Sequence, residues 1–263
     1  MRSTGSFCVT DDDLAACADL VRQADSERFR AVMASPVAAR RVLFPLYAFN
    51  AEVARAPWMT QEPMIAQMRL QWWREVLEEI REGGPVRRHM VATPLAGLLD
   101  GEATRLLDDL IVARHWDIGT DPFADEAALD AYLTHTAGHL MWVAARLLGA
   151  DDPAPLLARG HAHGLANWLR AVPQLKAAGR RPLPDERPEA IRALAQRGLA
   201  RLEEAQKAKL PKGARAALLP AWQAGLILRR AQAQPARVMQ GNLDVSPLRS
   251  RLMLMMRAAV SFG

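Results

Sequence analysis

Apolar residues recur every three or four positions along almost the whole chain, and this spacing constrains the fold more than any other feature. Such spacing matches the turn of an amphipathic α-helix, whereas a half-buried β-strand alternates apolar and polar residues. Alternating runs of β-branched and aromatic residues, which indicate strands, do not occur in the sequence. The chain is therefore predicted to be all-α.

Capping signals divide this pattern into separate helices. Ser35-Pro36 and Thr93-Pro94 begin helices and Gly83-Gly84 ends one, as expected for residues that cap or break helical backbone. Half of the 263 residues are hydrophobic, enough to bury one sizeable core, so we predict a single domain over residues 1–263 with a flexible tail at 1–10. The predicted helices cover residues 11–22, 25–34, 37–55, 61–82, 93–115, 125–148, 153–176, 187–208, 211–232 and 246–260.

The N-terminal region and the cysteines indicate a protein of a reducing compartment. Cys8 and Cys17 have no partnering Cys or His cluster, so neither a disulfide framework nor a zinc site is predicted. Small polar residues and an acidic run at 11–13 follow Arg2, a pattern unlike that of a cleaved signal. Because no run of roughly 18 apolar residues occurs, we expect no membrane-spanning helix. We predict a cytoplasmic protein.

Charge is distributed unevenly along the chain. Residues 187–263 contain 14 Lys/Arg and 4 Asp/Glu, whereas residues 1–186 contain 20 and 25. A basic segment of this kind attracts an anionic membrane surface or an acidic partner protein, and the simplest interpretation is a solvated helical surface. Motifs of nucleic-acid-binding domains are absent from the sequence, so we expect no nucleic-acid partner.

Three stretches share their order and spacing with one known family. The most informative runs Asn167-Trp-Leu-Arg-Ala-Val-Pro-Gln-Leu-Lys-Ala-Ala-Gly-Arg-Arg-Pro-Leu-Pro184 and resembles the second acidic motif of squalene and phytoene synthases. Another runs Arg40-Arg-Val-Leu-Phe-Pro-Leu-Tyr-Ala-Phe49 and resembles the helix that leads into their first acidic motif. The third runs Tyr132-Leu-Thr-His-Thr-Ala-Gly-His-Leu-Met141 and resembles a helix that lines their prenyl cavity.

The chain is therefore identified as a member of the squalene/phytoene synthase family. This resemblance implies a helical bundle of the isoprenoid-synthase type around a central cavity. Segments such as Asn50-Ala-Glu-Val-Ala-Arg55 are similar to a branch with degenerate aspartate motifs, which includes a mitochondrial assembly factor for respiratory complex I. The residues predicted to bind substrate are Arg40, Arg41, Tyr47, Phe49, Arg55, Asn167, Arg170 and Arg180.

The acids that hold magnesium in this family are missing from both motifs. In the first motif, their positions are occupied by Ala54, Arg55 and Trp58. In the second motif, they are occupied by Ala171, Gln174 and Leu175. Mg²⁺ needs oxygen ligands to neutralise the charge on a leaving diphosphate, so we predict no metal, no cofactor and no catalytic residue. Mg²⁺ is expected only for a displaced site, for which the candidates are Glu75, Glu78 and Glu79 or Asp108 and Asp109.

Arg55 places a guanidinium where the family has a carboxylate. One hypothesis is that it binds a phosphate or carboxylate directly, together with the arginines retained in the two motifs. The alternative is an ion pair with a neighbour such as Glu52.

Histidine and tryptophan residues near the third and second motifs are interpreted as packing residues. His135 and His139 have the spacing of a zinc-binding pair, but Thr136 replaces the Glu of His-Glu-x-x-His. Trp168 is predicted to fill part of the space left by the missing metal site, which would weaken prenyl binding.

The C-terminal segment has an apolar stretch, Leu252-Met-Leu-Met-Met256, with basic residues at its sides, Arg249, Arg251 and Arg257. This combination suits docking to a protein or peripheral contact with a membrane. The alternative is a final helix that closes the core.

Together these features predict a noncatalytic family member, a pseudoenzyme that binds a partner or a lipid. By resemblance to its branch, it assists respiratory complex I assembly, as a cytoplasmic protein with peripheral contact at the inner membrane. One alternative is an active prenyltransferase that condenses two prenyl diphosphates to squalene or phytoene. Another is a carrier that holds a prenyl diphosphate or other lipid in the central cavity without reaction.

Overall fold

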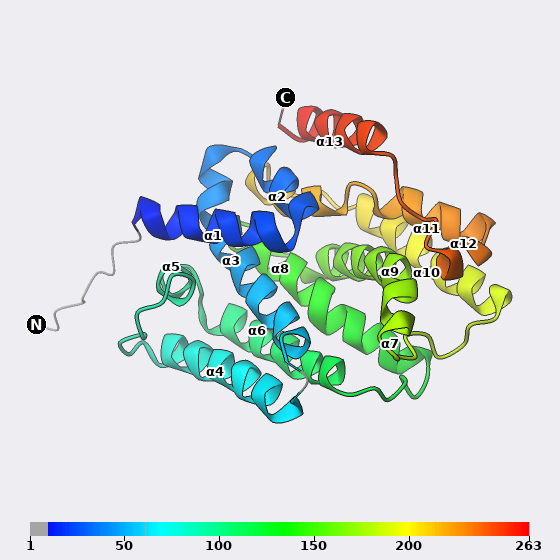
Figure 1. Cartoon of the computed structure of the whole chain (residues 1–263). Coiled ribbons are helices and arrows are strands. Elements are labelled where there is room, and N and C mark those ends of the chain that lie inside the picture. The colour runs from blue at the N-terminus through cyan, green and yellow to red at the C-terminus, as the bar shows by residue number, and fades with distance from the viewer. Residues whose placement is uncertain (1–9, 61, 263) are drawn as a thin grey trace, which may run out of the picture.

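The computed structural model describes residues 10–60 and 62–262, and every regular element in these ranges is helical (Figure 1). The all-α prediction is confirmed. Residues 1–9 of the predicted tail lie outside the described residues, and Thr10 is the N-cap of the first helix. The α-helices are α1 (Asp11–Ala24), α2 (Ser26–Met33), α3 (Val37–Arg55), α4 (Pro63–Glu82), α5 (Ala92–Ala96), α6 (Gly101–Arg114), α7 (Glu126–Leu133), α8 (His139–Arg146), α9 (Pro153–Ala177), α10 (Pro188–Gln206), α11 (Ala224–Ala233), α12 (Ala236–Gln240) and α13 (Pro247–Phe262). The shorter or tighter segments are η1 (Ala56–Trp58), η2 (His115–Ile118), η3 (Thr134–Gly138) and η4 (Gly213–Ala221).

Two predicted helices are interrupted in the N-terminal two thirds of the chain. The helix expected over 93–115 is divided because the side chain of Asp100 accepts a hydrogen bond from the backbone N–H of Ala103 at 2.8 Å and so starts α6. The helix expected over 125–148 contains one π-helical turn, η3. Turns of this kind are frequent at functional sites, and η3 forms part of the cavity described below.

The helix expected over 211–232 is also divided. Its first part, η4, is a 3₁₀ segment that contains Pro220, a residue without the backbone N–H that an α-helical hydrogen bond requires. The short helix α12, which follows α11, was not predicted.

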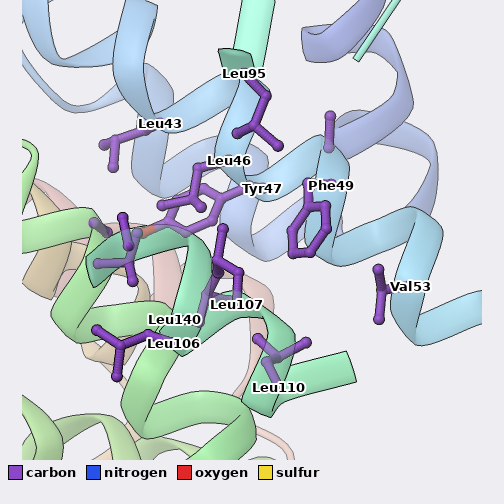
Figure 2. Packing of buried hydrophobic residues seen from close by; sticks show 14 of the residues in the cluster. Leu43, Leu46, Tyr47, Phe49, Val53, Leu95, Leu106, Leu107, Leu110 and Leu140 are labelled. Carbon is purple, nitrogen blue, oxygen red and sulfur yellow. The ribbon is translucent and has the colours of Figure 1, made fainter. Parts of the chain in front are cut away.

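Buried side chains form two large clusters. The first joins α1, α3, α4, α6 and α8, and Figure 2 shows Tyr47 and Phe49 of α3 among leucines of α6 and α8. The ring of Phe49 meets that of Trp73 edge-on, with 5.2 Å between centroids, so Phe49 is a core residue. The second cluster joins α7, α9, α10 and α11. Members of both clusters line the central cavity, such as Leu140 of the first and Trp168 of the second.

Two glycines let α9 approach η3 closely. A Cβ atom on Gly160 would lie 2.6 Å from the carbonyl oxygen of Ala137 and 2.8 Å from the Cα of Gly138. A Cβ on Gly164 would lie 2.6 Å from the Cβ of Ala137. Because these distances are shorter than van der Waals contact, only glycine fits. The close approach brings η3 and α9 together as one wall of the cavity.

Candidate functional site

A cavity with a volume of about 330 Å³ lies between α3, α7, η3 and α9. This volume is near the lower end of the range for ligand pockets, about 300–1,000 Å³. The lining residues are Arg28, Asn50, Ala54, Trp58, Arg114, Asp117, Tyr132, Leu133, Thr136, Ala137, Leu140, His163, Gly164, Asn167, Trp168, Ala171 and Leu175.

The two degenerate motifs meet at this cavity. Ala54 of α3 and Trp58 of η1 line one part of its wall, and Ala171 and Leu175 of α9 line another. Each pair is four residues apart, so both members of a pair lie on one helical face. Methyl, isobutyl and indole groups offer no oxygen ligand to Mg²⁺. The residues present therefore do not fit the magnesium ions that the family implies.

Asp117 is the only acid among the described residues that line the cavity. Its carboxylate accepts hydrogen bonds from the hydroxyl of Tyr132 at 2.9 and 3.0 Å and from Arg114 at 3.0 Å. Burial raises the pKa of Tyr132, so its hydroxyl stays protonated. Burial alone would lower the pKa of Arg114, but the charge of Asp117 and the hydrogen bonds with Asp117 and Tyr132 raise it. This carboxylate is thus already bound by two donors.

The cavity wall also contains a second paired cation, Arg28, and a neutral imidazole, His163. The Nε of Arg28 donates to Asp25 at 3.1 Å, and the guanidinium lies 4.7 Å from the centroid of the Tyr47 ring. Burial, and next the charge of Arg28, lower the pKa of His163 to about 3. The amide nitrogen of Asn167 lies 3.3 Å from the Nε2 of His163. Each cation at the cavity is therefore matched by a carboxylate.

Arg180 does not line the cavity itself but contacts residues that form its wall. Its guanidinium donates to the carbonyl oxygens of Gly119, at 2.5 Å, and of Asp117. The same group lies 4.3 Å from the centroid of the Trp58 ring, a cation–π distance. Arg180 therefore holds η1 against the segment after α6, and its donors point to main-chain oxygens.

Arg40 and Arg41 of the first motif do not line the cavity. Arg40 donates to the carbonyl oxygens of Ser35 at 3.1 Å and Met33 at 2.8 Å, at the end of α2. Arg41 is exposed and pairs with Asp11 at 3.4 Å. Both residues hold neighbouring helices together.

Arg55 and Arg170 also have partners elsewhere. Arg55 pairs with Glu52, which is the alternative raised from the sequence. Arg170 bridges Glu27 at 2.9 Å and Asp244 at 2.8 Å. The predicted arginines therefore do not converge on one anion, and of the predicted binding residues only Asn167 lines the cavity directly.

The acids considered for a displaced metal site are engaged in ion pairs. Asp108 pairs with Arg74 at 2.7 Å and Asp109 with Arg105 at 3.2 Å. The remaining pairs are Glu78 with Arg81, and both Glu75 and Glu79 with Arg87. Within residues 10–60 and 62–262, no group of three or more His, Cys, Asp or Glu side chains is placed to hold a metal ion.

His135 and His139 pack against each other, with 5.0 Å between ring centroids. The Nδ1 of His139 lies 3.1 Å from the carbonyl oxygen of Leu106. Burial lowers the pKa of His139, so the neutral imidazole serves as a packing and hydrogen-bonding group, as predicted.

Trp168 belongs to an aromatic cluster beside the cavity. Its ring centroid lies 5.2 Å from that of Tyr132, 5.6 Å from Trp116 and 5.8 Å from Phe123. Its indole N–H donates to the carbonyl oxygen of Pro182 at 2.9 Å. Trp168 is therefore fixed in the cavity wall, the place in which we predicted that it takes up space.

Four polar residues line the cavity but were not among the predicted binding residues: Arg28, Arg114, Asp117 and His163. Arg114 and Asp117 carried a usable signal, because residues three apart on a helix can form an ion pair. Arg28 and His163 carried none, since they are 135 positions apart in the sequence and meet at the cavity only in the tertiary structure.

Comparison with known proteins decides the family. Residues 21–188 match the family model described as squalene/phytoene synthase. This chain belongs to the squalene/phytoene synthase family. The matched region contains both degenerate motifs and every residue that lines the cavity.

Curated relatives carry the name NADH dehydrogenase (ubiquinone) complex I, assembly factor 6. The human protein is 26% identical over 161 residues, which are 60% of this chain and 48% of the relative. The Drosophila melanogaster homolog is 32% identical over 180 residues, which are 64% of this chain and 52% of the relative. The chain thus spans about half the length of the curated relatives it matches.

Solved structures of two synthases share the fold. A dehydrosqualene synthase in complex with ligand has a TM-score of 0.78 at 18% identity, over 95% of this chain and 96% of that one. Squalene synthase HpnC from Alicyclobacillus acidocaldarius has a TM-score of 0.67 at 18% identity, over 86% and 95%. The predicted isoprenoid-synthase-type bundle is confirmed.

Proposed function

We propose that this protein is a noncatalytic member of the squalene/phytoene synthase family that assists assembly of respiratory complex I. The observation that carries the proposal is the replacement of metal-binding acids by Ala54, Trp58, Ala171 and Leu175 in the cavity wall. The assembly-factor name of its curated relatives supports the class of partner.

The charges of the cavity support the noncatalytic part of this proposal. Ionisation of a prenyl diphosphate needs positive charge on the leaving group, which metal ions supply in metal-dependent catalysis. Arg28 and Arg114 are a poor substitute, because each is already paired with a carboxylate. A diphosphate placed here would also face Asp117 without an intervening metal.

The decisive experiment is deletion of the gene in its native host. We expect less assembled complex I on native gels and lower NADH:ubiquinone oxidoreductase activity, both restored by the wild-type gene. Succinate dehydrogenase activity in the same membranes is the control and should not change. Normal complex I in the deletion strain would contradict the proposal.

A second experiment addresses the alternative of an active prenyltransferase. Purified protein is incubated with Mg²⁺ and labelled farnesyl or geranylgeranyl diphosphate, alongside an active synthase. We expect pyrophosphate release at the rate of the protein-free blank. A C30 or C40 product would establish the alternative.

We further propose peripheral contact with the cytoplasmic face of the inner membrane through α13. No helix in the described ranges is both long and apolar enough to cross a bilayer. The side chains of Leu248, Leu252 and Met255 are 80%, 55% and 69% exposed. Arg249 and Arg251 are also exposed, and α13 contains no acid. An apolar stripe with basic edges is typical of helices that lie on anionic membranes.

A carrier role is a second candidate, favoured by the cavity itself. Its charges are balanced and much of its wall is apolar, so we propose that an uncharged isoprenoid binds more tightly than a prenyl diphosphate. Trp58 and Trp168 in the wall provide a fluorescence signal for titration with geranylgeraniol and with geranylgeranyl diphosphate. Tighter binding of the diphosphate would contradict this preference.

A further inference from the structure

A groove separate from the central cavity lies between α10, η4, α11 and α13, with α13 at the upper edge of the molecule in Figure 1. No residue lines both the groove and the cavity. The family match ends at residue 188, so these four elements all lie at or beyond its end. The groove is therefore built mainly from the segment that follows the family region.

Three arginines from different helices line this groove: Arg159 of α9, Arg229 of α11 and Arg257 of α13. Among the described residues, none of their guanidinium groups has a carboxylate oxygen within 4.0 Å. By contrast, Arg201 of the neighbouring α10 pairs with Asp130 at 2.7 Å. Three guanidiniums without a carboxylate partner in the described ranges, from three different helices, therefore lie at one recess.

The surroundings make the charge of Arg159 unfavourable without a ligand, whereas Arg229 and Arg257 are exposed. Arg159 is only partly exposed, and burial, followed by the charge of Arg257, lowers its pKa. The guanidinium of Arg229 folds over Gly225, with its Nη1 3.4 Å from where a Cβ would stand. An anion between these groups would offset both the repulsion and the desolvation.

The groove also has apolar walls, to which Leu199, Leu202, Leu226 and Met253 contribute. Its volume of about 150 Å³ leaves room for a phosphate group, whose oxygens suit the paired N–H donors of guanidinium groups. Glu203 is the one acid among the described lining residues, which leaves an excess of positive charge.

We infer that this groove binds an anionic amphiphile through its phosphate head, which contacts Arg159, Arg229 and Arg257, while its alkyl chain lies along the leucine and methionine side chains. This site is separate from the central cavity, and the inference does not rest on the proposed assembly function. Free phosphate and the head group of a membrane lipid share this chemistry, and the alkyl chain distinguishes them.

Calorimetric titration of the full chain with three probes tests the inference. The probes are dodecyl phosphate below its micellar concentration, inorganic phosphate, and dodecyl maltoside as a neutral amphiphile. We expect dodecyl phosphate to bind about tenfold or more tightly than either of the others, the size expected for one additional charge-assisted hydrogen bond or for partial burial of the chain. Equal affinity for maltoside or for inorganic phosphate, or no binding at all, would overturn it.

Matched variants on α13 locate the site. Met253, Arg257 and Ser261 are spaced four residues apart and share the face toward the groove. Arg251 is exposed, as Arg257 is, but does not line the groove. We expect Arg257→Gln to weaken dodecyl phosphate binding about tenfold and Arg251→Gln to leave it unchanged. Equal losses would indicate unspecific attraction, and no loss for Arg257→Gln would place the ligand elsewhere; both contradict the inference.

Removal of the groove's acid, Glu203, should change the affinity for dodecyl phosphate in the opposite direction. Glu203→Gln eliminates a negative charge at the groove and should tighten dodecyl phosphate binding, whereas Arg159→Gln should weaken it. Weaker binding in the Glu203→Gln variant would overturn the inference. Far-UV circular dichroism and thermal unfolding confirm that each variant is folded. No partner protein is present, so failure here leaves the assembly proposal intact, and complex I phenotypes test that proposal separately.

Discussion

The hydroxyl group of Tyr132 donates to the buried carboxylate of Asp117 at 2.9 and 3.0 Å, beside the guanidinium of Arg114. Removing the carboxylate leaves a largely buried cation without its partner. We expect Asp117→Ala to lower the free energy of unfolding by about 3–5 kcal/mol and Tyr132→Phe by about 1–3 kcal/mol. Urea denaturation monitored by circular dichroism measures both.

A surface pair provides the control for these variants. Asp109 and Arg105 are 3.2 Å apart, with side chains 40% and 62% exposed. Asp109→Ala should therefore change the free energy of unfolding by no more than about 1 kcal/mol. If the three variants were equally stable, Asp117 would not be the buried anchor of the cavity wall.

Acidification should destabilise the protein through His163. Its pKa is lowered by burial from 6.5 to about 3, so between these values the unfolded chain binds a proton that the folded chain does not. A group that binds more protons in the unfolded state makes stability rise with pH. We therefore expect the free energy of unfolding to fall by up to about 1.4 kcal/mol per pH unit below pH ~6. Urea denaturation at a series of pH values from 7 to 4.5 measures this slope.

Two histidine variants separate this effect from general acid denaturation. His163→Asn keeps a neutral polar side chain near Asn167 and should flatten the slope above pH ~4.5, where most carboxylates are still ionised. His135→Asn, at an exposed position, should leave the slope as in the wild type. His89, His139 and His161, whose pKa values burial also lowers, contribute to the slope that remains. An unchanged slope in His163→Asn would contradict the assignment.

Periodicity and capping residues predict this fold well where a helix is regular. The helix expected over residues 37–55 has the same bounds as α3. The π-helical turn η3 was not predictable, because it faces α9 at Gly160, and that contact arises only in the tertiary structure. Local sequence therefore determines the helices and the breaks at Asp100 and Pro220, whereas packing between distant segments determines the π-helical turn η3.

The candidate site was likewise predictable only where its features depend on local sequence. The resemblance to the family was enough to predict that Ala54 and Ala171 replace acids, and both line the cavity. The pairing of Arg55 with Glu52, three residues away, was also open to prediction. Arg170 is different, because its partner Glu27 lies 143 residues away in the sequence. No local pattern shows that such a guanidinium is already neutralised.

At Gly160 a tertiary contact decides whether replacement by Ala raises or lowers the free energy of unfolding. In a solvated helix, replacement of Gly by Ala stabilises by about 1 kcal/mol. At Gly160 the new Cβ would lie 2.6 Å from a backbone oxygen of η3, so we expect Gly160→Ala to destabilise by about 1–3 kcal/mol. Gly101→Ala is the control, because no atom lies within 4 Å of a Cβ at that helical position. A stabilised Gly160→Ala variant would show that α9 and η3 are not in close contact.

The exposed stripe of α13 predicts binding to anionic membranes. Vesicles of phosphatidylcholine alone and with one third phosphatidylglycerol are sedimented with the protein. We expect binding only to the anionic vesicles, because each basic residue near such a surface contributes about 1 kcal/mol and the apolar stripe adds buried area. Raising the salt concentration should weaken the binding, since exposed charges are screened.

Paired substitutions decide whether α13 itself makes this contact. The double variant Leu252→Glu with Met255→Glu places acids in the stripe and should abolish sedimentation with anionic vesicles. Met64→Glu with Met68→Glu is the matched control, because these methionines are 71% and 65% exposed on α4 and lie outside α13. Equal loss in both variants would reflect net charge alone. Unchanged binding in the α13 variant would favour the alternative that this helix only closes the core through Leu254, which packs beside Trp222.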